Sequence, residues 1–588
     1  MPESRCAMTQ AKACRWDFLP DDFDLAAALQ RSRGLNPAIA RVIANRGYAH
    51  DAGNFEGYLN PLLSSLHDPS LLRDMDAAVD RIMRAIRDRE QITIYGDYDT
   101  DGATSTALLY KMFSFLSARS NFYIPHRIEE GYGLNTAAVS ALAAAGTRLI
   151  VTVDNGITAA GPVAHAGSLG VDIIITDHHQ PASGESLPAA CAVVNPNRRD
   201  CPYPNKHLTG VGVAFKLCHA VLRAMRVPRS QATPFLRSLL DLVAIGTIAD
   251  VAPLVGENRV LVKHGLEVLM NTRNPGLIGI KRALELEGAR MTAQRIGFQI
   301  APRLNAAGRT DHAAISVQLL TATDPNAAFE MASLLDRLNR DRRTMEGAIL
   351  KACQQQIREE LDLDENLVIV VSGRDWHLGV IGIVASKIVE MHHRPVIVIS
   401  ENGEIGKGSA RSIKGFNIHD ALEACRDHLI AFGGHPFAAG LQVMPSRIPA
   451  LRQAVNDYAR SIMHEENLVP SLVIDTVVEP RETGETLLRD LRVLEPHGPA
   501  NPLPVLAMAS LRLAEKPRIV GANHLKLRLR SEDTFFDAIG FGLGHFLPVL
   551  DANLQEPVEV AFVPTVNDYY CEERLQLDVK DIRVPARV

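Results

Sequence analysis

Three short apolar runs, each closely followed by acidic residues, most constrain how this chain can fold. The runs and the residues that follow them are 92–95 before Asp97, 149–153 before Asp154, and 171–175 before Asp177. Segments of helical character at 104–117 and 136–145 separate the runs. Strands that alternate with helices in this way form a parallel sheet, and ligands bind at the carboxyl ends of its strands. We therefore predict an α/β domain whose acidic residues share one edge of a parallel sheet.

The first acidic cluster, at 96–102, carries aspartates at alternate positions directly after a strand: Asp97, Asp99 and Asp101. An exposed turn is one interpretation, because Asp and Gly favour turns. A calcium-binding loop is a second, but such a loop needs a glutamate where this chain has Leu108. Further acidic clusters occur downstream, and they are Asp154-Asn155-Gly156, Asp177-His178-His179, and Asp250 after another apolar helix or strand.

Four acidic sites at one edge of a sheet would repel one another at close range. Either the sites are therefore not clustered, or bound cations neutralise them. Carboxylates with one or two imidazoles suit Mn²⁺ or Mg²⁺ better than zinc, and none of the eight cysteines belongs to a C-x-x-C pair. Two such ions about 3.5 to 4 Å apart would polarise a phosphate and activate water, which predicts a phosphoesterase.

Four strings resemble motifs I to IV of the DHH phosphoesterase superfamily. They are DTDG at 99–102, VDNG at 153–156, DHH at 177–179 and IADV at 248–251. The resemblance implies six metal ligands, namely Asp97, Asp99, Asp101, Asp154, His178 and Asp250. It further implies that Asp154 bridges two ions, that Asp177 orients the histidines, and that His179 faces the phosphate.

The second half of the chain begins with a predicted long helix. Asp324 and Pro325 have the residue types of an N-cap and a first helical position. From there to residue 361 the chain is rich in helix-forming residues, which predicts one helix about 50 Å long. Runs at 367–371 and 395–399 then predict the strands of a smaller α/β unit that reaches about residue 465.

The string GGHPFAAG at 433–440 resembles the signature of the DHH-associated domain, DHHA1. A tight loop that opens a helix is one interpretation, and a phosphate-binding glycine loop is the other. With the nearby string KGSARS at 407–412, the resemblance implies that Ser409, Arg411 and His435 contact substrate.

The string PRLNAAGR at 302–309 is similar to an element of the RecJ family within this superfamily. It implies substrate contacts by Arg303, Asn305 and Arg309, although both arginines could also form surface ion pairs. Near the C-terminus, Leu525 to Arg530 alternate apolar and basic residues, which predicts an all-β module. The string EPHGPANP at 495–502 resembles a turn of the family's OB fold. Lys526, Arg528 and Arg530 form a basic face, which either is simply exposed to solvent or binds the backbone of single-stranded nucleic acid.

The predicted fold is thus α/β, with a parallel-sheet catalytic domain and a smaller α/β domain joined by a long helix, followed by an all-β OB-fold barrel. The expected boundaries are an N-terminal helical extension at 1–60, the DHH catalytic domain at 61–324, the connecting helix at 325–361, the DHHA1 domain at 362–465 and an OB-fold single-strand-binding domain at 466–588. Hydrophobic residues make up 46% of the chain and charged residues 22%, as in soluble proteins. No apolar run approaches the roughly 20 residues of a membrane span, and residues 1–19 do not resemble a signal peptide. We expect a cytoplasmic protein that has no membrane partner.

The resemblance implies an exonuclease that degrades single-stranded DNA from 5′ to 3′, releases 5′-mononucleotides and acts in DNA repair and recombination. It also implies single-strand-binding protein and a repair helicase as partners. The net charge of −6 gives no overall indication of nucleic acid binding. Two alternatives stay open: a DHH/DHHA1 phosphoesterase that acts on oligoribonucleotides or small nucleotides, and a non-catalytic replication factor that binds single-stranded DNA. The terminal β module argues against the first, and the complete set of carboxylates argues against the second.

Overall fold

The computed structural model of the protein describes residues 14–48, 52–127, 129–182, 184, 186–310, 312–567 and 574–584. It divides into two compact units. The core unit comprises Pro61–Ile462 together with the short segment Pro496–Asn501. The terminal unit comprises Met1–Asn60, Met463–Glu495 and Pro502–Val588. Each unit is described by itself below.

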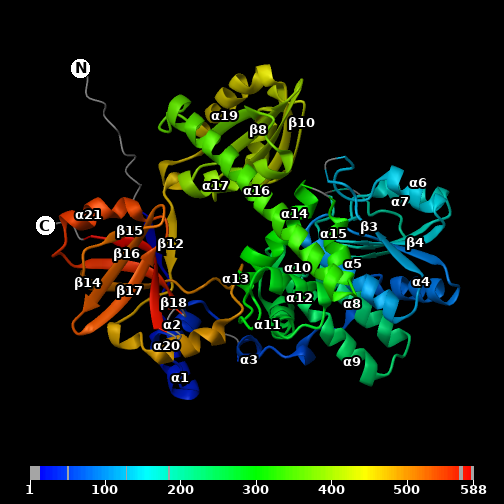
Figure 1. Ribbon diagram of the computed structural model, residues 1–588, viewed down its shortest axis with the longest axis horizontal. Coiled ribbons are helices and arrows are strands. Elements are labelled where there is room, and N and C mark those ends of the chain that lie inside the picture. Colours follow the sequence, from blue (N-terminus) through cyan, green and yellow to red (C-terminus); the bar gives the residue numbers. More distant parts are fainter. Residues whose placement is uncertain are drawn as a thin grey trace. The chain divides into compact units, whose positions relative to one another are not determined.

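The first half of the core unit is a five-stranded parallel sheet with the strand order β3-β2-β4-β5-β6. Its strands are β2 (Gln91–Tyr95), β3 (Ser120–Tyr123), β4 (Thr147–Val153), β5 (Asp172–Thr176) and β6 (Ala192–Val194). One face packs on α6 (Thr136–Ala144) and α7 (Ala160–Ser168), and the other on α4 (Met75–Arg87), α5 (Thr100–Phe115) and α8 (Gly210–Ala224) (Figure 1). This sheet confirms the α/β fold that the three apolar runs predict.

A layer of helices follows the sheet in sequence, and several of these helices pack on α5 or α8. It consists of α9 (Arg229–Ser238), α10 (Leu240–Ala249), α11 (Gly256–Met270), α12 (Pro275–Ala283), α13 (Ala293–Arg295), a π-helical turn (Ile296–Ile300), α14 (Ala301–Thr310) and α15 (Ala314–Thr321). Among the described residues, the stretch Arg229–Ala249 is long and apolar enough by composition to cross a membrane. Residues 240–247 of this stretch are all buried among α5, α8 and α11, so packing inside the core unit accounts for its apolar character.

The long helix is α16 (Pro325–Glu360), and Asp324 caps it by accepting from the backbone N–H groups of Asn326 and Ala327. It leads into a second five-stranded sheet with the order β10-β11-β9-β8-β7. The strands and helices of this part are β7 (Ile369–Arg374), α17 (Leu378–His392), β8 (Val396–Asn402), β9 (Ile405–Arg411), α18 (Ile418–Ala424), β10 (Ala431–His435), β11 (Ala438–Val443) and α19 (Ile448–Ile462).

The glycine-rich string at 433–440 differs from the expectation of a loop that opens a helix. It forms the tight hairpin between β10 and β11, with Gly434 opposite Ala439 and His435 opposite Ala438. Gly434 has φ 148°, and a Cβ there would lie 2.4 Å from the carbonyl oxygen of Ala438. The glycine therefore serves a close backbone approach within a hairpin, and the string continues into a strand.

The terminal unit is a small β-barrel whose sheet order is β13-β14-β18-β19-β17-β16-β15. Its strands are β13 (Thr476–Val477), β14 (Leu506–Leu513), β15 (Arg518–Val520), β16 (His524–Ser531), β17 (Thr534–Gly540), β18 (Val558–Asn567) and β19 (Arg574–Arg583), with the helices α20 (Glu485–Leu491) and α21 (Leu547–Ala552). Because β14 pairs with β16 as well as with β18, the sheet closes on itself. The closed sheet confirms the all-β barrel that the alternating pattern predicts.

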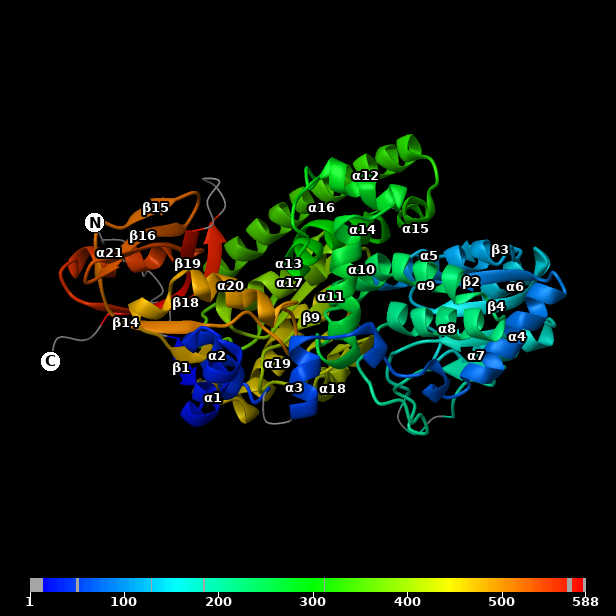
Figure 2. The same cartoon turned by 90° about the horizontal axis from the view of Figure 1, so that it is seen from below.

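Residues 14–48 and 52–60 belong to the same compact unit as this barrel, and buried apolar side chains among them pack against its core (Figure 2). Their elements are β1 (Arg15–Phe18), α1 (Phe23–Arg33), α2 (Pro37–Asn45) and α3 (Ala52–Leu59). Strand β1 pairs in parallel with β12 (Ser471–Ile474), which directly precedes the barrel in sequence. Arg46 donates to both carboxylate oxygens of the buried Asp475, at 2.6 and 2.9 Å. The N-terminal segment therefore includes a strand in addition to helices.

Candidate metal centre

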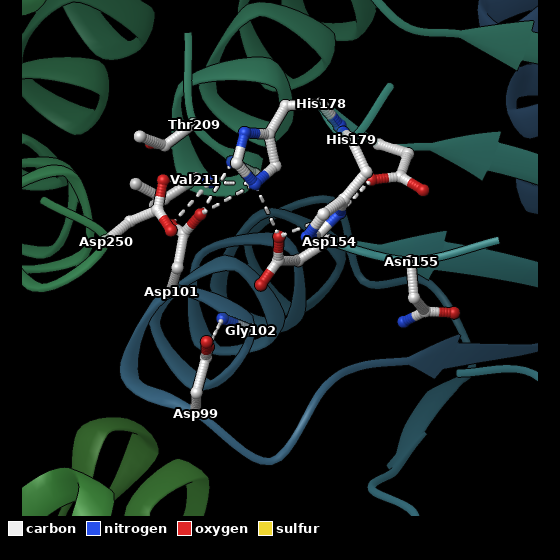
Figure 3. A network of polar contacts seen from close by, with 12 residues as sticks. Asp99, Asp101, Gly102, Asp154, Asn155, His178, His179, Thr209, Val211 and Asp250 are labelled. Atoms are coloured by element: carbon white, nitrogen blue, oxygen red, sulfur yellow. Dashed lines mark hydrogen bonds and ion pairs between the residues drawn. The ribbon is translucent and has the colours of Figure 1, made fainter. Parts of the chain in front are cut away.

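The acidic strand ends meet at one place in the core unit (Figure 3). Asp97 and Asp99 follow β2, Asp101 lies in the first turn of α5, and Asp154 follows β4. Asp177, His178 and His179 follow β5. Asp250 follows the C-terminal end of helix α10, which settles the helix-or-strand alternative for the run before it. All eight residues that the motifs single out therefore converge on the carboxyl edge of the parallel sheet.

Their ligand atoms form three groups in which every atom lies within 4.8 Å of the others. The groups are Asp97, Asp99 and Asp154; Asp101, His178 and Asp250; and Asp154, His178 and His179. His178 Nε2 lies 3.0 Å from Asp154 Oδ1 and 3.9 Å from Asp250 Oδ2. Asp154 belongs to two of the groups, so its position suits a ligand that two ions share.

Three atoms of this cluster are buried without a hydrogen-bond partner among the residues that the structure describes. They are Asp97 Oδ1, Asp154 Oδ1 and His178 Nε2. Buried polar atoms in folded proteins are normally paired, so atoms left in this way are suited to hold something that the chain does not supply. Carboxylate oxygens with one imidazole nitrogen match Mn²⁺ or Mg²⁺.

The electrostatics of the cluster also favour a bound cation. Burial, together with the neighbouring carboxylates, raises the pKa of Asp97 and Asp154 well above the ordinary range. Burial and the charge of the adjacent aspartate raise the pKa of Asp101 and of Asp250 to about 7. A bound divalent cation reverses this tendency, because it stabilises the ionised carboxylates. The residues present therefore fit the metal ions that the sequence predicts.

Backbone amides at the start of α8 and a glycine within α10 position the carboxylate of Asp101. The N–H of Gly210 donates to Asp101 Oδ2 at 2.6 Å, and the N–H of Val211 donates to Asp101 Oδ1 at 3.0 Å. A Cβ on Gly246 would lie 2.7 Å from Asp101 Oδ1, so only glycine allows α10 to pass this closely. None of the four DHH motifs includes these residues. Only the string LTGVGV at 208–213, with Thr209 as N-cap, could have suggested them.

Asp177 lies beneath the two histidines and orients them. Its Oδ1 accepts from the N–H groups of His178 and His179 and from His179 Nδ1 at 2.7 Å, while its Oδ2 accepts from the N–H of Ile157. Burial alone would raise the pKa of Asp177, but the hydrogen bond and charge of His179 hold it below its ordinary value. Burial lowers the pKa of His179, but Asp177 outweighs this effect and raises it to about 9. Tyr132, which no motif identified, adds its hydroxyl 3.2 Å from His179 Nδ1.

A group of arginines lies beside the carboxylates. Arg309 is largely buried and donates to the carbonyl of Gly379 at 3.0 Å. Burial and then the charges of Arg127, Arg342 and Arg411 lower its pKa to about 10, while Asp99 opposes them. Such concentration of positive charge away from water is unfavourable without an anion, so the group suits a phosphate.

Two members of this group are positioned by neighbours. Arg411 donates to Ser409 Oγ at 3.1 Å and to the carbonyl of Ala410 at 2.7 Å. Arg127 stacks over the ring of Tyr98, 4.7 Å from its centroid. Arg127 lies outside every recognisable motif, on the segment after β3, and no sequence signal indicated it.

The other predicted substrate residues make contacts within the protein. Asn305 Oδ1 accepts from the N–H of Thr100 at 2.8 Å, which places it against the first motif. Arg303 donates to Asp336 Oδ1 at 3.2 Å and to the carbonyl of Gln299 at 2.9 Å. His435 is exposed at the end of β10, where it pairs with Ala438, and Ala438 pairs with Arg411 on its other side. Substrate contact by these three residues stays a prediction.

Three family models match the chain in sequence order. They are the DHH family N-terminal domain at residues 91–247, the DHHA1 domain at 364–461 and the RecJ OB domain at 474–581. The chain is 38% identical over 581 residues to the single-stranded-DNA-specific exonuclease RecJ of Bacillus subtilis strain 168, which covers 98% of this chain and 71% of that protein. It is 36% identical over 566 residues to the protein of the same name from Escherichia coli K12, with 93% and 96% covered.

Solved structures show the same relationship. The crystal structure of RecJ from Thermus thermophilus in complex with Mn²⁺ superimposes with a TM-score of 0.81 at 30% identity, covering 98% of this chain and 80% of that one. The corresponding complex with Mg²⁺ gives a TM-score of 0.76 at 29% identity, with 98% and 79% covered. This chain therefore belongs to the RecJ family of metal-dependent, single-stranded-DNA-specific exonucleases.

Proposed function

We propose that this protein hydrolyses single-stranded DNA from 5′ to 3′ and releases 5′-mononucleotides. One observation carries the proposal: a cluster of carboxylates that suits two divalent cations lies beside a partly buried group of arginines that suits a phosphate. Cations and arginines in one site provide both the activation and the binding that phosphodiester hydrolysis needs. The barrel of the terminal unit adds a surface for a polymeric substrate.

We assign six residues to two Mn²⁺ or Mg²⁺ ions: Asp97, Asp99, Asp101, Asp154, His178 and Asp250. Asp154 is the shared ligand in this assignment, because its buried Oδ1 has no hydrogen-bond partner among the described residues and because Asp154 belongs to two of the three groups of ligand atoms. When bound, the ions supply Lewis acidity toward the phosphate and lower the pKa of the attacking water. The chain keeps the six ligands in place through the amides of α8 and the hydrogen bonds of Asp177.

His179 is placed to contact the scissile phosphate. Its Nδ1 is held by Asp177, so Nε2 is the nitrogen that remains to donate. Although burial lowers the pKa of this imidazole, the hydrogen bond and charge of Asp177 raise it to about 9 in the metal-free protein, which favours the protonated form at neutral pH. In our proposal the protonated ring donates to a non-bridging oxygen and offsets the negative charge that develops there. As water forms a new bond to phosphorus, the bond from phosphorus to the 3′-oxygen breaks, and the proton that the water loses is balanced by one gained at that oxygen. This leaves a 3′-hydroxyl on the released nucleotide and a 5′-phosphate on the remaining strand.

The arginine group can explain why the strand would be degraded from its 5′ end. Arg127, Arg309 and Arg411, with Ser409, would bind the terminal 5′-phosphate through charge-assisted hydrogen bonds. A doubly charged phosphate monoester at a strand end matches this charge better than an internal diester does. If the arginine group holds the 5′-phosphate while the next phosphate of the strand lies at the carboxylates, the enzyme cleaves the strand from its 5′ end.

The barrel presents a surface that suits a single strand. Lys526, Arg528 and Arg530 lie on the same face of β16, and Phe535 lies opposite Arg530 on β17. Arg528 stacks over the half-exposed ring of Phe535, 5.5 Å from its centroid. Basic and aromatic side chains on a strand face bind the backbone and stack on the bases of single-stranded DNA. The partner proteins in this proposal, a single-strand-binding protein and a repair helicase, rest on the family resemblance alone. The cytoplasmic location rests on the composition of the chain.

A comparison of labelled substrates tests the proposal. Single strands labelled at the 5′ or the 3′ end, a blunt duplex and an RNA of the same sequence would be incubated with Mn²⁺ or Mg²⁺. We expect the 5′ label to be released first, as a mononucleotide, and we expect the duplex and the RNA to resist. Earlier release of the 3′ label would refute the polarity, and preferential hydrolysis of RNA or dinucleotides would favour the small-substrate alternative.

A further inference from the structure

A six-residue loop, Pro496–Asn501, is part of the core unit although the chain on both sides of it belongs to the terminal unit. The terminal unit holds Met463–Glu495 before the loop and Pro502–Val588 after it. The loop therefore leaves the barrel's chain, packs on the core, and returns. We call it the 496–501 loop.

The 496–501 loop packs on the segment that follows Asp250. The carbonyl of Pro499 accepts from the backbone N–H of Leu254 at 2.9 Å. Gly498 lies against the Leu254 side chain so closely that a Cβ at 498 would be 2.7 Å from Leu254 Cδ1 and 3.0 Å from Cγ. The carbonyl of Pro496 accepts from the buried guanidinium of Arg259 at 3.5 Å.

Hydrogen bonds within the 496–501 loop stabilise its conformation. Gly498 and Asn501 exchange two backbone hydrogen bonds, of 2.9 and 3.0 Å. The buried side chain of Asn501 donates to the carbonyl of Pro496 at 2.8 Å, and Ala500 adopts φ 60°. A closed turn of this kind has few conformations available, so the Pro499 carbonyl reaches Leu254 from a fixed position.

The segment that receives the loop turns sharply. Asp250 is the C-cap of α10, and Val251, directly after it, has φ 58° and an exposed side chain. A β-branched residue rarely adopts this backbone conformation, which persists only where the surrounding structure enforces it. The far end of the turn is Leu254, which is 1% exposed and packs in a cluster with Val262 and Ala293. The turn that carries Asp250 is thus enforced by α10 at one end and by Leu254 at the other.

We propose that the 496–501 loop is a positioning element for Asp250. By holding Leu254, it keeps the strained turn in the conformation that directs the Asp250 carboxylate at His178 and Asp101. The inference rests on the proposed function, in which Asp250 is a metal ligand. It implies that correct placement of Asp250 depends on the 496–501 loop, which lies in sequence between the segments that form the terminal unit.

The test compares Mn²⁺ affinity, measured by calorimetry on the full chain, between Gly498→Val and the wild type. Valine at 498 must displace Leu254, and the turn then relaxes. Removing a group that orients a metal ligand lowers affinity by about 10- to 100-fold, so we expect a loss of about tenfold or more. Gly57→Val is the matched control, because Gly57 is exposed on α3 and a Cβ there meets no atom within 4 Å.

Two further variants separate positioning from other effects. Gly498→Val combined with Leu254→Ala makes room for the valine and keeps the backbone hydrogen bond from residue 254 to Pro499, so we expect it to recover part of the lost affinity. Arg528→Ala changes the barrel face and not the loop, so it should weaken binding of long strands and leave Mn²⁺ affinity unchanged. Gly498→Val should lower kcat on a dinucleotide and on a long strand by the same factor.

Unchanged Mn²⁺ affinity in a folded Gly498→Val chain, judged by circular dichroism, would overturn the inference. If that variant does not fold, Gly498→Ala makes the same contact with a smaller side chain and is judged by the same criterion. Failure of the wild-type chain itself to bind Mn²⁺ would instead refute the proposed function, and the inference with it.

Discussion

Gly210, the first residue of α8, lies against Asp154 so closely that a Cβ at position 210 would be 2.6 Å from the Cβ of Asp154 and 2.9 Å from its Oδ1. The backbone N–H of the same glycine donates to Asp101 at 2.6 Å. One residue without a side chain therefore holds two carboxylates that come from different motifs. No side chain can be accommodated here unless Asp154 moves.

Gly210→Ala should consequently damage the metal centre while the fold survives. We expect Mn²⁺-dependent hydrolysis of single strands to fall about 10- to 100-fold, as for other changes that misplace a metal ligand. Gly161→Ala on α7 is the control, because a Cβ there meets no atom within 4 Å. Equal activity of the two variants in a single-strand digestion assay would show that Asp154 tolerates displacement.

Asp154→Ala should abolish Mn²⁺-dependent nuclease activity with little loss of folding. The variant removes a buried carboxylate that Asp101 and Asp99 repel, so the melting temperature of the metal-free protein should not fall. The increase in melting temperature that Mn²⁺ produces in the wild type should disappear, because that increase comes from binding to the folded state. Thermal melts with and without Mn²⁺ measure both effects, and a variant that digests single strands normally would disprove the ligand assignment.

Mn²⁺ affinity should fall as the pH falls below about 7. Asp101 and Asp250 have pKa values of about 7 in the metal-free protein, because burial and neighbouring carboxylates favour the protonated form. Below that pH each group must lose a proton before it coordinates an ion, so protons compete with the metal. Calorimetry at a pH of about 6, in two buffers of different ionisation enthalpy, should detect proton release on Mn²⁺ binding. An absence of proton release under those conditions would contradict the raised pKa values.

Arg411→Ala should weaken recognition of the strand end. Loss of a hydrogen bond from a charged group costs about 1.5 to 3 kcal/mol, which corresponds to a rise of about tenfold or more in KM. The effect should be larger for a 5′-phosphorylated strand than for a strand with a 5′-hydroxyl. Arg374→Ala, at an exposed position at the end of β7, is the control, and equal effects on the two substrates would place the 5′-phosphate elsewhere.

Phe535→Ala should affect long strands only. The ring is half exposed beside Arg528, and stacking of one base on an aromatic side chain contributes about 1 to 3 kcal/mol. Affinity for a strand of several dozen nucleotides, measured by fluorescence anisotropy, should fall, while the rate of dinucleotide cleavage stays the same. An unchanged affinity for long strands would exclude this face of the barrel from DNA binding.

Local patterns were sufficient to predict much of this protein. The runs before Asp97, Asp154 and Asp177 alternate with helices, and a parallel sheet necessarily brings such strand ends to one edge. Alternation of Leu525, Leu527 and Leu529 with basic residues defines the buried and exposed faces of a strand without reference to the remainder of the fold. These inferences succeeded because burial imposes a period on the sequence itself.

Other features depend on residues that the chain brings together from far apart. Arg127 joins Arg309 and Arg411, Gly210 touches Asp154, and the 496–501 loop packs on Leu254. None of these contacts has a sequence period or a motif, because each depends on the direction of a single side chain or amide after the elements have packed.

The glycine-rich string at 433–440 is a case in which the sequence predicted a local feature but not the element that contains it. Its composition indicates a close backbone approach, which the structure contains, but composition does not distinguish a helix start from the hairpin of β10 and β11. The sequence by itself determined the fold class, the family and the residues that gather at the sheet edge. The reason is that the period of buried residues and the order of the motifs are local properties of the chain. Only the tertiary structure decided which amides and glycines hold those residues and added Arg127 to the arginines that the motifs had named, because such contacts arise from packing between distant segments.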